Sequence, residues 1–177
     1  VMRWPRHDAA SSATDVTGPV LIVAGSVSNV THRQMESLLA NGQVRLVSMQ
    51  AESLIADAAC EIRRCTQEAE QVFGEGLDVL LASAMAADAV EQARSAGKSK
   101  GMDNLKVSEI IADALGQVAR ELIGLKPAGL FLTGGDTAIA VCRALGVSAI
   151  RILSEVSTGI PLGRLSGGIC PGLRVVT

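Results

Sequence analysis

Residues 19–24, PVLIVA, form a compact apolar run that ends at Gly25 and leads into the polar stretch SVSNVTHRQ at 26–34. A short apolar run closed by glycine predicts a buried strand, and the stretch after it predicts a loop that opens a helix. The same order of strand and then helix returns along the chain. Further runs that predict strands stand at 43–48, 77–83, 129–132, 149–153 and 173–177. Strands that alternate with helices predict an α/β fold with a mainly parallel sheet.

The segments between these runs have the periodicity of amphipathic helices, which we expect at 32–40, 52–73, 105–125 and 137–145. Thr31 would be the N-cap of the first helix, because Gln34 follows at the spacing of a capping box. Residues 84–101 predict either a short helix with a loop or a mobile excursion. Residues 159–172 predict a turn-rich stretch, because glycine and proline recur there.

Together these elements predict a single domain over residues 19–177. It would have a Rossmann-like, three-layer architecture, with helices on both faces of the sheet. Residues 1–18 mix Ser, Thr, Asp and Pro without periodicity, which predicts a linker or a loosely docked N-terminal arm. The pattern leaves the order of the strands open.

Composition excludes several classes of function. Hydrophobic residues make up 48% of the 177 residues and aromatic residues 2%, and there is no tyrosine. A protein that binds single-stranded nucleic acid needs aromatic platforms for its bases, so that class is excluded. The net charge is −2 and no run of Lys or Arg occurs, so DNA, RNA and anionic lipid are not expected as partners. The apolar runs are too short to cross a bilayer.

The four cysteines predict reduced, mostly buried thiols of a cytoplasmic protein. They stand at Cys60, Cys65, Cys142 and Cys170, with no CxxC pair and no histidine at ligand spacing. A zinc site or a disulfide framework would need one of those patterns.

Two glycine-bearing loops, 24–31 and 133–137, each join a strand to a helix. In a parallel sheet both would lie at the carboxyl edge, where open α/β folds bind ligands. Glycine allows close approach of the backbone, and free amides at a helix start favour negative charge, so the pattern suits a polyphosphate. The candidate nucleotide-binding residues are Gly25, Ser26, Ser28, Thr133, Gly134, Gly135, Asp136 and Thr137.

Each loop also has a purely structural interpretation. Gly25-Ser26 would serve as a tight turn, and Asp136 as a helix N-cap. Neither loop is a P-loop or a GxGxxG fingerprint. His32 and Arg33 would lie beside the first loop, where they contact either phosphate or solvent. The lysines of the 98–106 region would reach a nucleotide only if the 84–101 segment folds over the site.

Four stretches carry a resemblance to a known family. They read VLIVAGSVSNVTHRQ at 20–34, GLDVLLAS at 76–83, LFLTGGDTAIAVCRALGV at 130–147, and EVSTGIPLGRL with GLRVVT at 155–165 and 172–177. In this order they resemble the C-terminal domain of the four-carbon acid sugar kinases. Members of that family use ATP to phosphorylate a terminal hydroxyl of threonate, erythronate or oxo-tetronate, and Mg²⁺ is the expected metal.

The resemblance implies a role for each matching residue. Ser26 and Ser28, with Gly134 and Gly135, would line the nucleotide, while Asp136 and Thr137 would neighbour its phosphates or their metal. The family pattern also includes a glycine-rich loop after the last strand and an N-terminal domain with the sugar-acid site. This sequence contains neither, so we expect no catalytic residue in the chain and no turnover by the chain alone. The oligomeric state stays open, with a homo-oligomer as one possibility.

Two other hypotheses fit parts of the sequence. The segment IVAGSVSNVTHRQM at 22–35 resembles the opening of the aminoimidazole-ribonucleotide carboxylase mutases, whose loop holds a ribonucleotide phosphate. The TGGDT and GIPLG elements fit that family less well. A non-catalytic interaction module is the other alternative, and it predicts an exposed apolar patch with no affinity for nucleotides.

Overall fold

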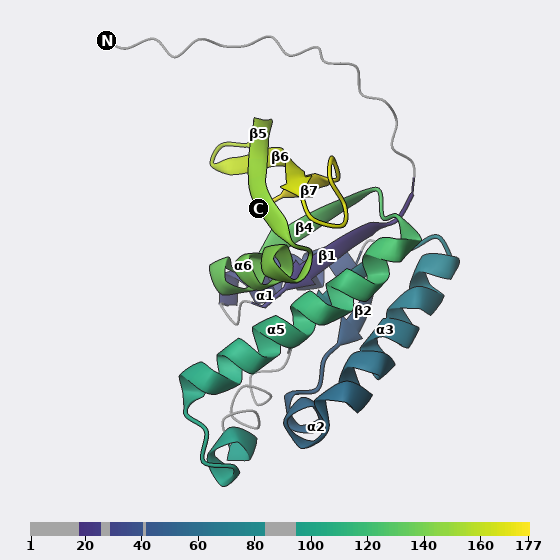
Figure 1. The fold of residues 1–177 in the computed structure, drawn as a ribbon. Coiled ribbons are helices and arrows are strands. Elements are labelled where there is room, and N and C mark those ends of the chain that lie inside the picture. The colour runs from purple at the N-terminus through teal and green to yellow at the C-terminus, as the bar shows by residue number, and fades with distance from the viewer. Residues whose placement is uncertain (1–17, 26–28, 41, 84–94) are drawn as a thin grey trace.

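The computed structural model describes residues 18–25, 29–40, 42–83 and 95–177. Its strands build a seven-stranded sheet in the order β2-β3-β1-β4-β7-β6-β5 (Figure 1). The elements in chain order are β1 (Val20–Ala24), α1 (Asn29–Leu39), β2 (Val44–Ser48), α2 (Ala51–Ala56), α3 (Ala58–Gly74), β3 (Asp78–Ala82), α5 (Asn104–Leu122), the 3₁₀ helix η1 (Ile123–Leu125), β4 (Gly129–Thr133), α6 (Gly135–Ala144), β5 (Val147–Ser157), β6 (Ile160–Gly167) and β7 (Arg174–Val176).

The predicted α/β class and mainly parallel sheet are confirmed. Strand β1 pairs in parallel with β3 and β4, β2 pairs in parallel with β3, and β7 pairs in parallel with β4. Ala24, the last residue of β1, lies opposite Ala82 of β3 and Thr133 of β4. The carboxyl ends of these three strands therefore share one edge, and the two glycine-bearing loops begin there.

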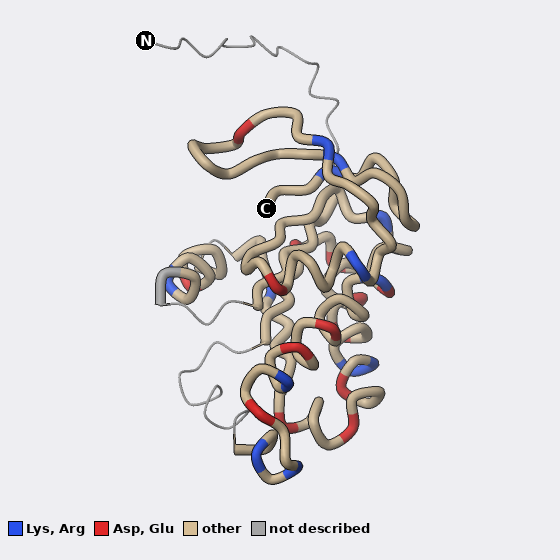
Figure 2. The backbone as a smooth tube through the Cα atoms, turned by 60° about the vertical axis from the view of Figure 1, so that its left-hand side comes forward, with Lys and Arg blue, Asp and Glu red and all other residues tan. Residues whose placement is uncertain are grey.

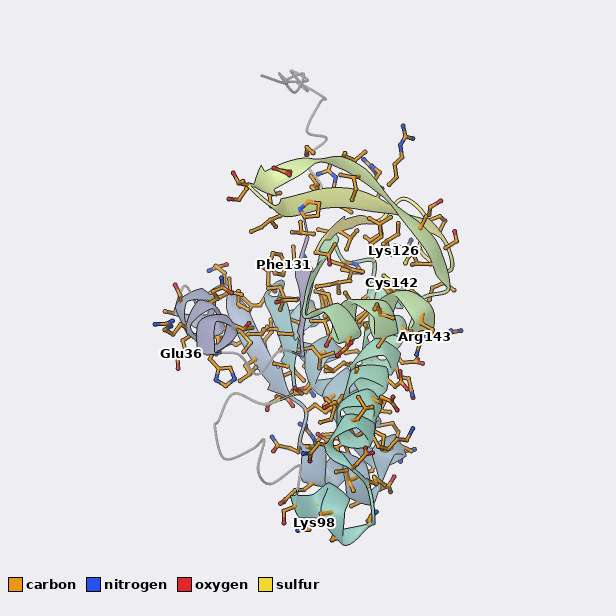
Figure 3. All side chains as sticks on the ribbon, turned by 90° about the vertical axis from the view of Figure 1, so that its left-hand side faces the viewer. Glu36, Lys98, Lys126, Phe131, Cys142 and Arg143 are labelled. Carbon is orange, nitrogen blue, oxygen red and sulfur yellow. The ribbon has the colours of Figure 1, made fainter. Side chains whose placement is uncertain are left out.

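Helices cover both faces of the sheet, as predicted, but unequally. Figure 3 shows α1 on one side of the sheet and α5 with α6 on the other, and α3 lies beside α5 (Figure 1). Residues alternate between the faces along β1: Leu21 and Val23 join the core under α3, α5 and α6, whereas Ile22 and Ala24 join the smaller core under α1. The α1 face is only partly covered, because Phe131 of β4, which lies on that face, is 39% exposed.

The turn-rich stretch expected at 159–172 is partly wrong. Strand β6 pairs antiparallel with β5, and the two form a hairpin around a turn at Thr158 and Gly159. Gly159 has a φ of +78°, which glycine adopts without strain. Gly163 is required inside β6, because a Cβ there would lie 2.9 Å from the carbonyl oxygen of Arg151. Glycine and proline therefore mark a close-packed hairpin here, and the strand expected at 149–153 extends over β5.

Two helix boundaries also differ from the expectation. Helix α1 begins at Asn29, so Thr31 lies inside its first turn with 8% exposure and is not its N-cap. The helix expected over 52–73 is broken between α2 and α3 at Asp57, which has an extended backbone. The Asp57 carboxylate accepts a hydrogen bond from the amide of Cys60, 3.0 Å away. An aspartate that caps a new helix ends the preceding one, which periodicity alone does not reveal.

Part of the 84–101 segment is outside the described residues, and residues 95–99 are helical. No helix in the described ranges is long and apolar enough to span a membrane.

Candidate functional site

The two glycine-bearing loops meet at the carboxyl edge of the sheet. The amide of Gly25 donates a hydrogen bond to the carbonyl of Thr133, with 3.3 Å between nitrogen and oxygen. Gly25 also lies directly against the side chain of Thr137, where an added Cβ would come within 1.8 Å of Oγ1. The first loop therefore starts in contact with both ends of the second, and only glycine fits at position 25.

The second loop turns from β4 into α6 at Gly134. Gly134 has a φ of +95° and serves as the N-cap of α6 without a side-chain hydrogen bond to the helix start. Gly135 is exposed, and a Cβ added to it would meet no atom within 4 Å. Asp136 is exposed in the first turn of the helix. Open backbone at the start of a helix favours an anion at this place.

The predicted site residues thus divide into three groups. Thr133, Gly134, Gly135 and Asp136 form the open turn, while Gly25 and Thr137 form the packed contact beneath it, with Thr137 4% exposed. Ser26 and Ser28 lie outside the described residues, so their positions stay predictions.

His32 lies in α1, directly after the first loop in the chain, and is half-buried, not the solvated residue that its place near a helix start suggests. Its Nε2 atom is buried and has no hydrogen-bond partner among the described residues. A buried polar atom without a partner is uncommon in a folded protein. It makes His32 a candidate for contact with a group outside the described residues.

A pocket of about 620 Å³ opens beside the turn, on the α1 face of the sheet. Its floor comes from β1, β3 and β4 and its walls from α1 and the tip of the β5–β6 hairpin. Figure 3 shows Phe131 in the space between that hairpin and α1. The pocket is lined by Val20, Ile22, Ala24, Thr31, Gln34, Met35, Leu38, Asp78, Leu80, Phe131, Leu132, Thr133, Gly134, Gly135, Gly159, Ile160 and Thr177.

Most of this pocket was not predicted from the sequence. Phe131 stands between the buried residues Leu130 and Leu132, so strand alternation alone places it on the opposite face. That signal was present in the sequence. Ile160 comes from a hairpin that was not predicted, and only the tertiary structure brings it to the pocket.

The other notable polar cluster lies at the end of β2. Glu61, 3% exposed, accepts hydrogen bonds from the Gln50 amide (2.6 Å) and from Arg64 Nη2 (2.7 Å). Burial opposes ionisation of Glu61, but the hydrogen bonds from Arg64 and Gln50 and the Arg64 charge outweigh it and lower the pKa of the carboxyl. Arg64 Nη2 also donates to the Ser48 carbonyl at 2.7 Å. The polar groups of this cluster satisfy one another, which fits a structural role.

The described residues contain no group of three His, Cys, Asp or Glu side chains arranged to hold a metal. A metal at the open turn would therefore rely on Asp136 and on oxygens from a ligand. Mg²⁺ is commonly bound by one or two carboxylates together with substrate phosphates, so the residues present are compatible with it.

Comparison with known proteins places these features in a family. Residues 21–177 match a family described as a nucleotide-binding C-terminal domain. The chain is 33% identical over 161 residues to D-threonate kinase of Salmonella typhimurium, covering 90% of this chain and 38% of that kinase. It is 28% identical over 168 residues to D-erythronate kinase of Heliobacterium modesticaldum, covering 89% of this chain and 37% of that one.

Solved structures agree with this relationship. A domain of unknown function from Bordetella bronchiseptica, a domain-swapped dimer, matches with a TM-score of 0.64 and 31% identity, over 90% of this chain and 36% of that one. A Haemophilus influenzae protein matches with a TM-score of 0.71 and 18% identity, over the same shares, which supports the fold alone. The chain thus spans well under half the length of its relatives. It belongs to the family of nucleotide-binding C-terminal domains, and specifically to those of the four-carbon acid sugar kinases.

Proposed function

We propose that this domain binds ATP for a bacterial, cytoplasmic kinase that phosphorylates a terminal hydroxyl of a four-carbon sugar acid. The observation that carries the proposal is the open Gly134-Gly135 turn at the start of α6, next to a pocket of about 620 Å³. Ligand pockets of this size hold molecules as large as a nucleoside. Residues 19–177 would form the nucleotide-binding domain and residues 1–18 an arm or linker to the rest of the kinase.

In this proposal the phosphates of ATP lie at the turn and the nucleoside lies in the pocket. The amides at the start of α6 and the hydroxyl of Thr133 would bind the phosphate oxygens. Ser26 and Ser28 would add donors from the first loop. The half-exposed face of Phe131 would contact the adenine ring, because aromatic and aliphatic walls with a few polar groups are typical of cofactor pockets.

Phosphoryl transfer depends on positioning and on stabilising the charge that spreads over the transferred group. Bound Mg²⁺ would neutralise part of that charge. Asp136 would hold the metal from the first turn of α6, and Thr137 would keep Gly25 and the turn in place from below. The acceptor hydroxyl and the group that deprotonates it would come from the sugar-acid site elsewhere in the kinase. We therefore expect no turnover from this chain alone.

The relatives named above act on D-threonate and D-erythronate, and others on 3-oxo-tetronate. This supports a sugar acid of the same class as the acceptor. A homo-oligomer is also part of the proposal, supported by the domain-swapped dimer of the Bordetella bronchiseptica relative.

The test is calorimetric titration of the chain with ATP and ADP, with and without Mg²⁺, beside a ribonucleoside monophosphate. The decisive variant is Gly135→Val, because the position has free space in the empty protein and would lose it only to a ligand. Gly124→Val is the matched control, since a Cβ there also meets no atom within 4 Å.

Binding of ATP that disappears in Gly135→Val and persists in Gly124→Val would support the proposal. Equal ATP affinity in both variants would show that the turn does not hold phosphate. Binding of the monophosphate alone would favour the ribonucleotide-binding alternative. The absence of binding to any nucleotide, also in the full-length kinase, would favour the interaction module.

A further inference from the structure

Three arginines stand side by side across the last three strands of the sheet. Arg164 of β6 lies opposite Arg151 of β5 and, on its other side, opposite Arg174 of β7. Residues directly opposite in neighbouring antiparallel strands point to the same face of a sheet. The three guanidinium groups therefore leave the same face as one row, called here the arginine row.

The face that carries the row is the one without α5 and α6. Leu165 and Val175, the neighbours of Arg164 and Arg174 along their strands, are 3% and 0% exposed and belong to the core under those helices. Because side chains alternate along a strand, the arginines lie on the opposite face. Arg151 and Arg164 are exposed, and Arg174 is half-buried.

The charge of this region differs in sign from that of the whole chain. Residues 147–177 contain three arginines, no lysine and one acidic residue, Glu155, whereas the chain has a net charge of −2. Figure 2 shows basic positions at the base of the hairpin and most acidic positions on the helices. Among the described residues, no carboxylate forms an ion pair with Arg151 or Arg164; Arg164 donates to the carbonyl of Gly172 at 2.9 Å.

Like charges directly opposite each other in a sheet are unfavourable. A bound anion would remove that repulsion. Neighbouring strands are about 4.8 Å apart, so two adjacent guanidinium groups can bind one oxyanion each, or share one. Arginine is also the side chain best suited to carboxylate and phosphate, because its planar fork makes paired hydrogen bonds with both.

We propose that the arginine row is a binding site for a small molecule with two or more oxyanion groups, either a dicarboxylate or a diphosphate. None of the three arginines lines the pocket of the proposed nucleotide site. Val175 of β7 lies opposite Leu130 of β4, so Arg174, one residue earlier, is level with the start of β4. Thr133 stands at the other end of β4. At about 3.3 Å per residue, Arg174 lies roughly 13 Å along the strands from the end of β4, where the turn proposed to hold the phosphates begins.

The probes are glutarate and inorganic pyrophosphate, each titrated calorimetrically into the chain at fixed ionic strength, with acetate as the singly charged control. The test variant is Arg151→Gln with Arg164→Gln. The matched control is Arg45→Gln, which removes an exposed arginine from β2 at the far side of the sheet. A third variant, Arg151→Lys, keeps the charge and loses the fork. Circular dichroism checks that each variant is folded.

Pyrophosphate can also bind at the Gly134-Gly135 turn, so each titration is repeated in Gly135→Val. We expect at least one probe to bind more tightly than acetate, with a Kd at least tenfold weaker in the double variant and unchanged in Arg45→Gln and Gly135→Val. The Kd of Arg151→Lys should lie between those of the wild type and the double variant. The probe that binds with the lower Kd identifies the ligand class. The same Kd in the double variant and the wild type, or no binding of either probe to the wild type, would overturn the proposal whether or not ATP binds.

Discussion

Gly25 and Thr137 are in direct contact across the carboxyl edge of the sheet, with no room for a side chain at position 25. A Cβ at that position would lie 1.8 Å from Thr137 Oγ1 and 3.0 Å from Thr137 Cβ. Gly25 directly follows the last residue of β1, and Thr137 lies in the first turn of α6. This contact sets the distance between the two loops of the proposed nucleotide site.

We predict that Gly25→Ala separates these loops. The free energy of unfolding should fall by about 1–3 kcal/mol, the usual cost of overpacking, and ATP affinity should fall with it. Thr137→Ala removes Oγ1, so the double variant should recover part of the lost stability. Urea denaturation of the single and double variants measures this. Additive losses would show that the two residues do not interact.

The break between α2 and α3 gives a second prediction. Asp57→Ala removes the acceptor for the Cys60 amide and should lower the free energy of unfolding by about 1 kcal/mol, a typical loss for an N-cap. Gln67→Ala, an exposed position of α3, is the control and should change it little. Asp57→Asn should retain most of the stability, since asparagine also caps helices. If Asp57→Asn and Asp57→Ala lower the free energy of unfolding equally, capping is excluded as the cause.

The Glu61 carboxylate should make stability depend on pH in the acid range. Its pKa in the folded chain lies below its ordinary value of 4.5, so the unfolded chain takes up the proton first as the pH falls. The stabilisation is therefore complete above about pH 4.5 and is lost as the pH falls through the folded pKa.

Replacement of Glu61 by Gln should cost about 2 kcal/mol at neutral pH, because a charged, buried hydrogen-bond acceptor is lost. The difference from the wild type should shrink in acid. Urea titrations at about pH 7 and about pH 4 test this. Glu70→Gln, on an exposed position of the same helix, is the control. A difference between wild type and Glu61→Gln that does not change with pH would contradict the assignment.

Thiol reactivity should follow burial. Burial raises the pKa of Cys65 to about 12, and the residue is 0% exposed, whereas Cys60 is exposed. Because the thiolate is the nucleophile, iodoacetamide should label Cys60 in the folded chain and leave Cys65 unmodified until the chain unfolds. Peptide mass spectrometry follows both sites. Equal labelling in the native state would mean that α3 opens readily.

The arginine row has a consequence for stability without any ligand. Arg151→Gln removes one of two like charges directly opposite each other, so the chain should become more stable by about 0.5 kcal/mol at low salt. The gain should vanish at high salt, where exposed charges are screened. Thermal unfolding at two salt concentrations measures both effects, and a loss of stability at low salt would show that Arg151 makes a favourable contact.

Much of the architecture was predictable because it depends on local patterns. Short runs rich in apolar residues predicted the five parallel strands, since strands buried on both faces need mainly apolar segments. The two loops were predicted to share an edge because parallel strands end together, and Gly25 does contact Thr133 and Thr137. The family resemblance rested on the same segments and was confirmed over residues 21–177.

Tertiary contacts decided the rest. Glycine and proline in residues 159–172 looked like turns, but Gly163 permits β6 to pass close to Arg151, and sequence patterns do not show close approach between distant segments. The pocket depends on that hairpin, because Ile160 reaches it only after β5 and β6 pair. The arginine row likewise depends on strand register. Register is set by how the strands pair, and the spacing of the arginines along the chain does not reveal it. The sequence by itself determined the parallel strands, the approximate course of the helices and the edge where the site lies, because periodicity and turn chemistry are local. The β5–β6 hairpin, the register and the pocket walls required the folded chain, because they are contacts between segments far apart.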